Sequence, residues 1–144
     1  DRRQRQMCIR DSSIIVSNSN AIRDCNVFVI CVPTGVTSSH EPDLFPLKSA
    51  CFVVGSNLKK GDLVIFESTV FPGATDEICI PILEEYSGLT LNIDFGVGYS
   101  PERINVGEEI HHLSITPKII SGSSSEVLNK IEKLYSSIIS APLC

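Results

Sequence analysis

Apolar residues gather into short runs of strand length, separated by amphipathic stretches of helix length. The run NVFVICV at residues 26–32 and the run LVIFE at residues 63–67 are almost continuously apolar and rich in β-branched residues. Continuous rather than alternating apolarity predicts strands covered on both faces, as in a parallel sheet. Two shorter runs, at residues 95–99 and 118–121, predict two further strands.

The first amphipathic stretch predicts a helix that begins near Pro42 and Asp43 and ends at the basic, glycine-stopped segment 59–61. Its apolar positions recur at helical spacing: Leu44, Leu47, Cys51, Val54 and Leu58.

Two more helices are predicted further along the chain. One runs from an N-cap at Thr75 to a stop near Gly88, with Pro81 kinking it or marking its boundary. The other follows a capping arrangement of serines at 123–125 before Glu126. Its apolar positions are Val127, Leu128, Ile131, Leu134, Tyr135 and Ile138.

The resulting order is strand, helix, strand, helix, strand, strand, helix. Such alternation predicts an α/β fold: a partial Rossmann-like, doubly wound, mainly parallel sheet with helices on both faces. Ligands bind such sheets beyond the carboxyl ends of the strands. Polar segments follow three of the predicted strands, at residues 32–35, 67–70 and 100–104. We expect these three segments to converge on one crevice.

Composition narrows the classes of function. The net charge of −5 argues against a nucleic-acid partner, and no apolar run reaches the ~18 residues of a membrane span. We expect no secretory signal, because no apolar segment follows the basic N-terminal residues. The six cysteines have no metal-ligand spacing, and we interpret them as small buried thiols in a reducing compartment, the cytoplasm. The adjacent His111 and His112 do not share a helix face, so no metal site is expected.

The first twelve residues differ from the rest of the chain. Residues 1–12 hold four of the 12 Lys and Arg residues and show no helical or strand periodicity. We expect this segment to be a non-native tail. The alternative is a basic arm that binds an anionic partner.

Three motifs carry a family resemblance when they are taken together and in order. They are CVPT at residues 31–34, ESTVFPGAT at residues 67–75 and YSPERINVG at residues 99–107. Together they resemble the UDP-glucose/GDP-mannose dehydrogenase family, and within it the UDP-N-acetylhexosamine 6-dehydrogenases of bacterial surface-polysaccharide synthesis. The resemblance covers about residues 12–139. It implies an NAD-dependent, two-step oxidation of the C6 alcohol of a UDP-sugar to the uronate.

The resemblance also implies roles for particular residues. The cofactor side is assigned to Pro33, Thr34, Ser68 and Thr69. Thr69 also holds the water near the reacting carbon, and Glu102 is implicated in proton transfer during thioester hydrolysis. Arg103 and Ile104 line the nucleotide-sugar site. The chemistry is reasonable, because thioester hydrolysis needs a base positioned within hydrogen-bond reach of a water.

Other features depart from the family pattern. The family usually has proline where Gly35 and Val106 stand, and the GxGxxG fingerprint is absent, with Gly96-Val97-Gly98 the nearest approach. The resemblance places the nucleophilic cysteine outside this chain. We therefore expect residues 13–144 to be a partial NAD-binding domain that lacks the first strands and the substrate domain, is inactive alone and comes from a homo-oligomeric parent.

Two other functions remain open at this point. The chain could be a non-catalytic nucleotide-binding scaffold, or part of a Rossmann oxidoreductase that acts on another hydroxy substrate. The motifs do not say which nucleotide sugar is oxidised.

Overall fold

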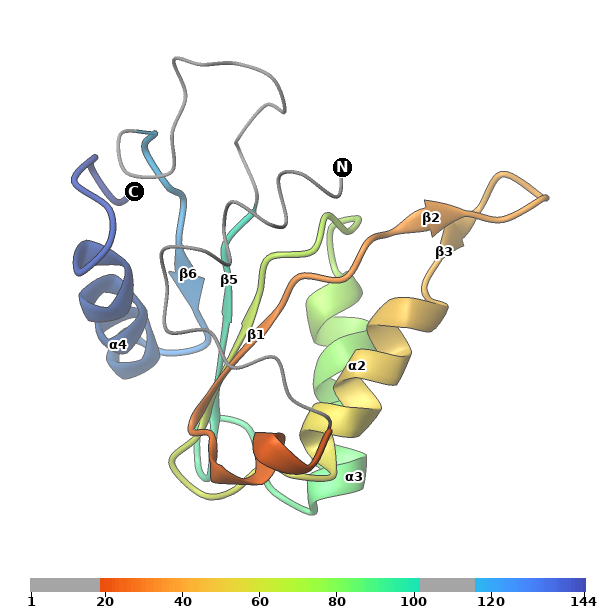
Figure 1. Cartoon of the computed structure of the whole chain (residues 1–144), viewed down its shortest axis with the longest axis horizontal. Helices are drawn as coiled ribbons and strands as arrows, with labels where there is room; N and C mark the ends of the chain where they lie inside the picture. The colour runs from red at the N-terminus through yellow and green to blue at the C-terminus, as the bar shows by residue number, and fades with distance from the viewer. Residues whose placement is uncertain (1–18, 102–115) are drawn as a thin grey trace.

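Four strands form the central sheet of the computed structural model, which describes residues 19–101 and 116–144 (Figure 1). The strands are β1 (Val27–Ile30), β4 (Leu63–Phe66), β5 (Gly96–Tyr99) and β6 (Ser121–Gly122), in the order β1-β4-β5-β6. The first three are parallel, and β6 runs antiparallel to β5. This arrangement confirms the predicted α/β class with a mainly parallel sheet.

Helices cover both faces of the sheet, as predicted. Helices α2 (Phe45–Gly55) and α3 (Ile80–Ser87) lie on one side, and α4 (Ser125–Ser136) lies on the other (Figure 1). Each side has its own core. Phe28, Val64 and Phe66 pack with α2 and α3, whereas Leu63 and Ile65 pack with α4. Because successive side chains of a strand point to opposite faces, the continuous apolarity of β4 serves both cores.

Glycine lets α4 lie close to the far side of the sheet. A Cβ atom on Gly98 would stand 2.1 Å from Cδ1 of Ile131, and one on Gly96 would stand 2.5 Å from Cγ2 of Val127. Real Cβ atoms do not make contacts this short. The GVG run therefore has a packing role in the strand, and no phosphate-binding turn is formed there.

The first predicted helix has different boundaries in the structure. Pro42–Asp43 is a short strand, β3, paired with β2 (Gly35–Val36), and α2 begins only at Phe45. The carboxylate of Asp43 accepts the N–H of Phe45 at 3.0 Å. The helix ends at Gly55 rather than at residues 59–61.

The other helix predictions were partly right. Thr75 is not an N-cap: it begins a π-helical turn, η2 (Thr75–Cys79), and Pro81 stands in the first turn of α3. Gly88 does end α3, in the left-handed conformation. The side chain of Ser124 caps α4 by accepting the N–H of Val127, which confirms the serine cap. The strand predicted at residues 118–121 is only β6 with an isolated bridge at Lys118.

The interpretation of the cysteines as buried thiols holds for only two of those described. Cys51 and Cys79 are buried in the α2–α3 core, whereas Cys25, Cys31 and Cys144 are exposed. A short 3-10 helix, η1 (Ser19–Asp24), leads into β1, so Cys25 lies in the connection between them. Within the described ranges no helix combines the length and the apolarity needed to cross a bilayer.

Candidate functional site

The carboxyl ends of β1, β4 and β5 meet at one edge of the sheet. Ile30 pairs in register with Phe66, and Phe66 pairs with Tyr99, so all three strands end at the same level. The polar segments after them start from this common edge. The sequence prediction of convergence is supported for the first two segments and for the start of the third. Glu102, Arg103 and Ile104 lie outside the described residues, as do residues 1–12, Val106, His111 and His112.

A direct hydrogen bond joins the first two segments. Oγ1 of Thr34 donates to the backbone carbonyl of Thr69 at 2.6 Å. Thr69 itself is exposed, and its own hydroxyl hydrogen-bonds to none of the described residues. Pro33 is exposed beside Thr34. This part of the edge therefore presents a hydroxyl group to solvent from a backbone that is held in place.

The two serines behind the edge serve the fold. Ser68 is buried, and its hydroxyl donates to the carbonyl of Ile30 at 3.3 Å. Ser100 is also buried, and its hydroxyl donates to the carbonyl of Ile119 at 2.7 Å. These bonds fix the ends of β4 and β5 to neighbouring chain segments. The side chain of Ser68 thus lies behind the surface that Thr69 occupies.

A hollow opens beside this edge on the α3 side of the sheet. Its volume is about 520 Å³, and it is bounded by the loop 70–73, the start of η2, and the strands β5 and β6. Ligand pockets commonly occupy ~300–1,000 Å³. Thr75, Asp76 and Ser123 give it polar groups, and Val97 and Tyr99 give it an apolar floor.

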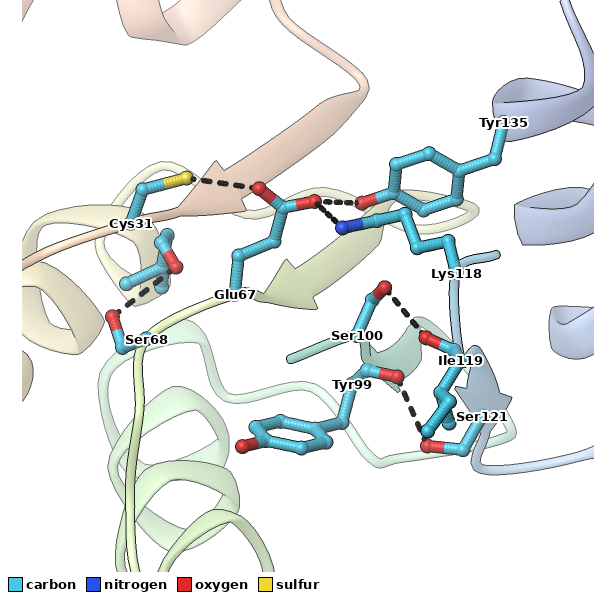
Figure 2. Close-up of polar contacts among 10 residues, drawn as sticks. Cys31, Glu67, Ser68, Tyr99, Ser100, Lys118, Ile119, Ser121 and Tyr135 are labelled. Atoms are coloured by element: carbon cyan, nitrogen blue, oxygen red, sulfur yellow. Dashed lines mark hydrogen bonds and ion pairs between the residues drawn. The ribbon is translucent and has the colours of Figure 1, made fainter. Parts of the chain in front are cut away.

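A cluster of charged and polar side chains stands on the opposite, α4 side of the edge (Figure 2). Nζ of Lys118 is 3.0 Å from Oε1 of Glu67, and the hydroxyl of Tyr135 donates to the same oxygen at 2.5 Å. Sγ of Cys31 donates to the other carboxylate oxygen at 3.5 Å. The Lys118 ammonium also stands over the Tyr135 ring, 5.0 Å from its centroid.

Electrostatics within this cluster favour the ionised carboxylate. Burial opposes ionisation of Glu67, but hydrogen bonds from Tyr135 and Lys118, together with the Lys118 charge, lower its pKa below the ordinary value. Burial and the adjacent carboxylate raise the pKa of Tyr135, so its hydroxyl keeps its proton. The cluster therefore holds a carboxylate, an ammonium group and a neutral phenol.

The sequence did not identify Glu67, Lys118 or Tyr135 as candidate site residues. One signal was present: Lys118 is a charged residue at the first position of the run predicted as a strand, and a lysine that becomes buried in a sheet needs a partner. Its partner could not be found by spacing, because Glu67 lies 51 positions earlier in the sequence. Among the described residues, no group of three or more histidine, cysteine, aspartate and glutamate side chains is placed to hold a metal ion.

The chain is similar in sequence to one family of nucleotide-sugar dehydrogenases. Residues 6–139 match the model of the UDP-glucose/GDP-mannose dehydrogenase family, NAD binding domain. The chain is 50% identical over 124 residues to UDP-N-acetyl-D-glucosamine 6-dehydrogenase of Pseudomonas aeruginosa, covering 86% of this chain and 29% of that protein. It is 49% identical to the Salmonella typhi protein of the same name, covering 87% of this chain and 29% of that protein.

A solved structure agrees with the sequence matches. The UDP-D-ManNAc dehydrogenase from Pyrococcus horikoshii superposes with a TM-score of 0.84 at 34% identity, covering 99% of this chain and 34% of that one. The chain therefore spans about a third or less of the length of these relatives.

Proposed function

Because this chain belongs to the UDP-glucose/GDP-mannose dehydrogenase family and matches its NAD-binding domain, we propose that its protein oxidises a UDP-N-acetylhexosamine. The reaction converts the C6 alcohol to the uronate. The names of the relatives support this substrate class. We propose that the uronate product enters the synthesis of a surface polysaccharide.

The observation that carries the proposal is the Thr34–Thr69 link at the carboxyl edge of the sheet. NAD is the cofactor of this domain family, and the described residues fit it, because the edge offers an exposed threonine hydroxyl, that of Thr69. Hydroxyl groups of this kind can pair with ribose or amide groups of a dinucleotide. We assign Pro33, Thr34 and Thr69 to the cofactor side, with Ser68 supporting them from behind.

The chemistry needs a hydride acceptor, which bound NAD supplies, and groups that manage water and protons. We propose that Thr69 orients the water that attacks the acyl carbon. Glu102 then accepts a proton from that water, while Arg103 and Ile104 bind the nucleotide sugar. Glu102 follows Ser100 by two positions, and the hydrogen bonds of Ser100 fix the chain just before it. Ser100 is therefore a fixed starting point for the segment that carries the base, and we propose that Glu102 lies within reach of a water bound at Thr69.

We propose that the described domain supplies the cofactor side of the reaction and that the thioester-forming cysteine lies elsewhere in the protein. None of the six cysteines of this chain stands in a motif we assign to that step. We further propose that residues 1–12 take no part in the domain, that the protein works in the cytoplasm and that it is a homo-oligomer.

The test is turnover by the protein produced from the complete reading frame that encodes this chain. We expect NAD reduction with a UDP-N-acetylhexosamine, and two molecules of NADH per sugar, because alcohol-to-carboxylate oxidation removes four electrons. UDP-glucose, GDP-mannose and simple hydroxy acids complete the substrate panel. If only hydroxy acids support NAD reduction, the protein is an oxidoreductase that acts on another substrate class. NAD binding without turnover of any substrate would favour a non-catalytic scaffold.

Variants connect the activity to the edge residues. Glu102→Gln should lower kcat by about 10²–10⁴-fold, the usual contribution of a general base. Thr69→Val should lower kcat less severely, because the threonine orients the water and takes no proton. Thr90→Val is the matched control, since Thr90 is exposed on the loop that leads into β5, at the opposite edge of the sheet. Unchanged kcat in Glu102→Gln would refute its assigned role.

A further inference from the structure

The Glu67–Lys118–Tyr135 cluster lies behind the edge that carries Thr69. The side chains of Lys118 and Glu67 are only 6% and 18% exposed, and Tyr135 is buried. Three different parts of the chain meet there: the end of β4, the segment that leads into β6, and α4 (Figure 2). The cluster thus joins elements that are far apart in the sequence.

Hydrogen bonds extend the cluster to the end of β5. Next to Lys118, the carbonyl of Ile119 accepts the hydroxyl of Ser100 at 2.7 Å, and two residues further on the hydroxyl of Ser121 donates to the carbonyl of Tyr99 at 3.1 Å. Glu67 begins the other branch, because it directly precedes Ser68 and Thr69. A displacement of Lys118 would therefore affect both strand ends.

Stability alone is a poor explanation for this arrangement. A buried ion pair costs about as much to desolvate as it returns in attraction, and an apolar pair of similar size is often as stable. What the ion pair supplies is geometry, since the carboxylate must face one particular ammonium group and one particular hydroxyl. That requirement matters where two strand ends must hold a fixed separation.

We infer that Glu67, Lys118 and Tyr135 are positioning residues, which set the placement of the Thr69 segment relative to the Ser100–Pro101 segment that leads to Glu102. This inference rests on the proposed function, because it assigns a purpose to the spacing between the water-orienting threonine and the base. The cluster touches neither reacting group, and it acts through the two strand ends.

A positioning role predicts that loss of the ion pair lowers kcat and leaves the affinity for the cofactor almost unchanged. Lys118→Met keeps a long unbranched chain but leaves the Glu67 carboxylate without its cation. We expect kcat to fall at least about 10-fold, because ångström-scale misplacement of reacting groups can cost up to ~10² in rate. KM for NAD should change less than about 3-fold, because Thr34 and Thr69 keep their own link. Lys118→Arg restores the charge and should recover most of kcat.

Two further variants exclude a merely structural role. In Glu67→Gln/Lys118→Met, both charges are gone, so the thermal midpoint should recover toward that of the unmodified protein while kcat remains low. The matched control is Lys130→Met, which breaks the exposed Lys130–Glu126 pair on the outer side of α4 and should alter neither quantity. If kcat instead recovers together with the thermal midpoint in the double variant, the positioning role is wrong.

Hydrogen exchange provides a readout that does not depend on turnover. In the complete protein, Lys118→Met should speed amide exchange in segments 67–70 and 98–101 together, and Lys130→Met should not. If exchange is faster in both segments but the protein oxidises no nucleotide sugar, the proposed function is wrong. The cluster would still be shown to fix the two strand ends. If the unmodified protein oxidises the nucleotide sugar and Lys118→Met changes neither exchange nor kcat, the positioning role is wrong and the proposed function stands.

Discussion

Hydroxyl groups at the carboxyl edge divide into those that hold the fold and one that faces outward. Ser68 and Ser100 are buried and donate to backbone carbonyls, whereas Thr34 uses its hydroxyl to fix the Thr69 backbone. Only the Thr69 hydroxyl, among these four, is exposed and has no hydrogen bond to the described residues. Of these four hydroxyl groups, that of Thr69 is therefore the one exposed at the surface where we propose that the cofactor binds.

Replacing Thr34 tests whether the fixed backbone matters for cofactor binding. Thr34→Val keeps the shape of the side chain and removes the donor to Thr69. One net hydrogen bond is worth about 0.5–1.5 kcal/mol, so we expect the Kd for NAD to rise by about 2–10-fold. Isothermal titration of the complete protein measures this change. An unchanged Kd would show that the link between the two segments does not organise the cofactor side.

The ionisation of Glu67 predicts how stability depends on pH. The pKa of Glu67 is lowered in the folded state, so its contribution is present above the unfolded-state pKa of about 4.3 and is lost as pH falls through the folded-state value. Glu67→Gln should therefore be less stable than the unmodified chain at pH 7, by about 1–3 kcal/mol. The gap should close on acidification below about pH 4. Urea unfolding across this range measures it, and a gap that stays constant would contradict the ion-pair account.

At the scale of elements, the packing of α4 depends on strand residues that lack side chains. Gly96 and Gly98 leave room for Val127 and Ile131, so the helix lies directly on the backbone of β5. The sequence showed this run only as an imperfect fingerprint. The start of α2 also differs from the predicted one, because Pro42 and Asp43 pair with β2 and the carboxylate of Asp43 accepts the N–H of Phe45, where the helix begins.

A single added methyl group tests the close packing. Gly98→Ala should destabilise the chain by about 1–3 kcal/mol, because its Cβ would meet both Cδ1 of Ile131 and the carbonyl of Ser121. The matched control is Gly35→Ala, whose new Cβ would meet nothing nearer than 3.8 Å. Denaturant midpoints of the two variants give the comparison. Equal midpoints would mean that α4 can move away without cost.

At the scale of the whole molecule, one side of β1 remains open in the described structure. β1 pairs only with β4 among the described strands, and the side chains of Val27 and Val29 are 43% and 47% exposed. They face away from the α2–α3 core, which contains their neighbours Phe28 and Ile30. An edge strand with apolar side chains is a surface on which chains associate.

We therefore expect the 144-residue chain to self-associate as its concentration rises. Val27→Lys/Val29→Lys should shift the population toward monomer, because charged side chains on an edge strand oppose pairing. Sedimentation velocity over a concentration series measures the shift. A charge-matched pair of changes at exposed positions of α4, Asn129→Lys and Ser136→Lys, should leave association unchanged if β1 is the surface involved.

The sequence by itself determined the fold class and the order of the main strands and helices, and it predicted the edge of the sheet at which we expect a ligand. Those features are local: runs of apolar residues define strands, helical spacing defines helices, and parallel strands place their carboxyl ends together. Ser124 at the start of α4 and Gly88 at the end of α3 were likewise readable, because caps depend on neighbouring residues.

Only the tertiary structure decided which side chains meet. It brought Lys118 into contact with Glu67, which lies 51 positions earlier in the sequence, and with Tyr135, which lies 17 positions later. It assigned the hydroxyls of Ser68 and Ser100 to the fold, left Thr69 exposed, and exposed Cys25 and Cys31 where apolar context suggested burial. The physical reason is that burial and pairing depend on the faces that distant elements present to each other, and periodicity along one segment carries no information about them.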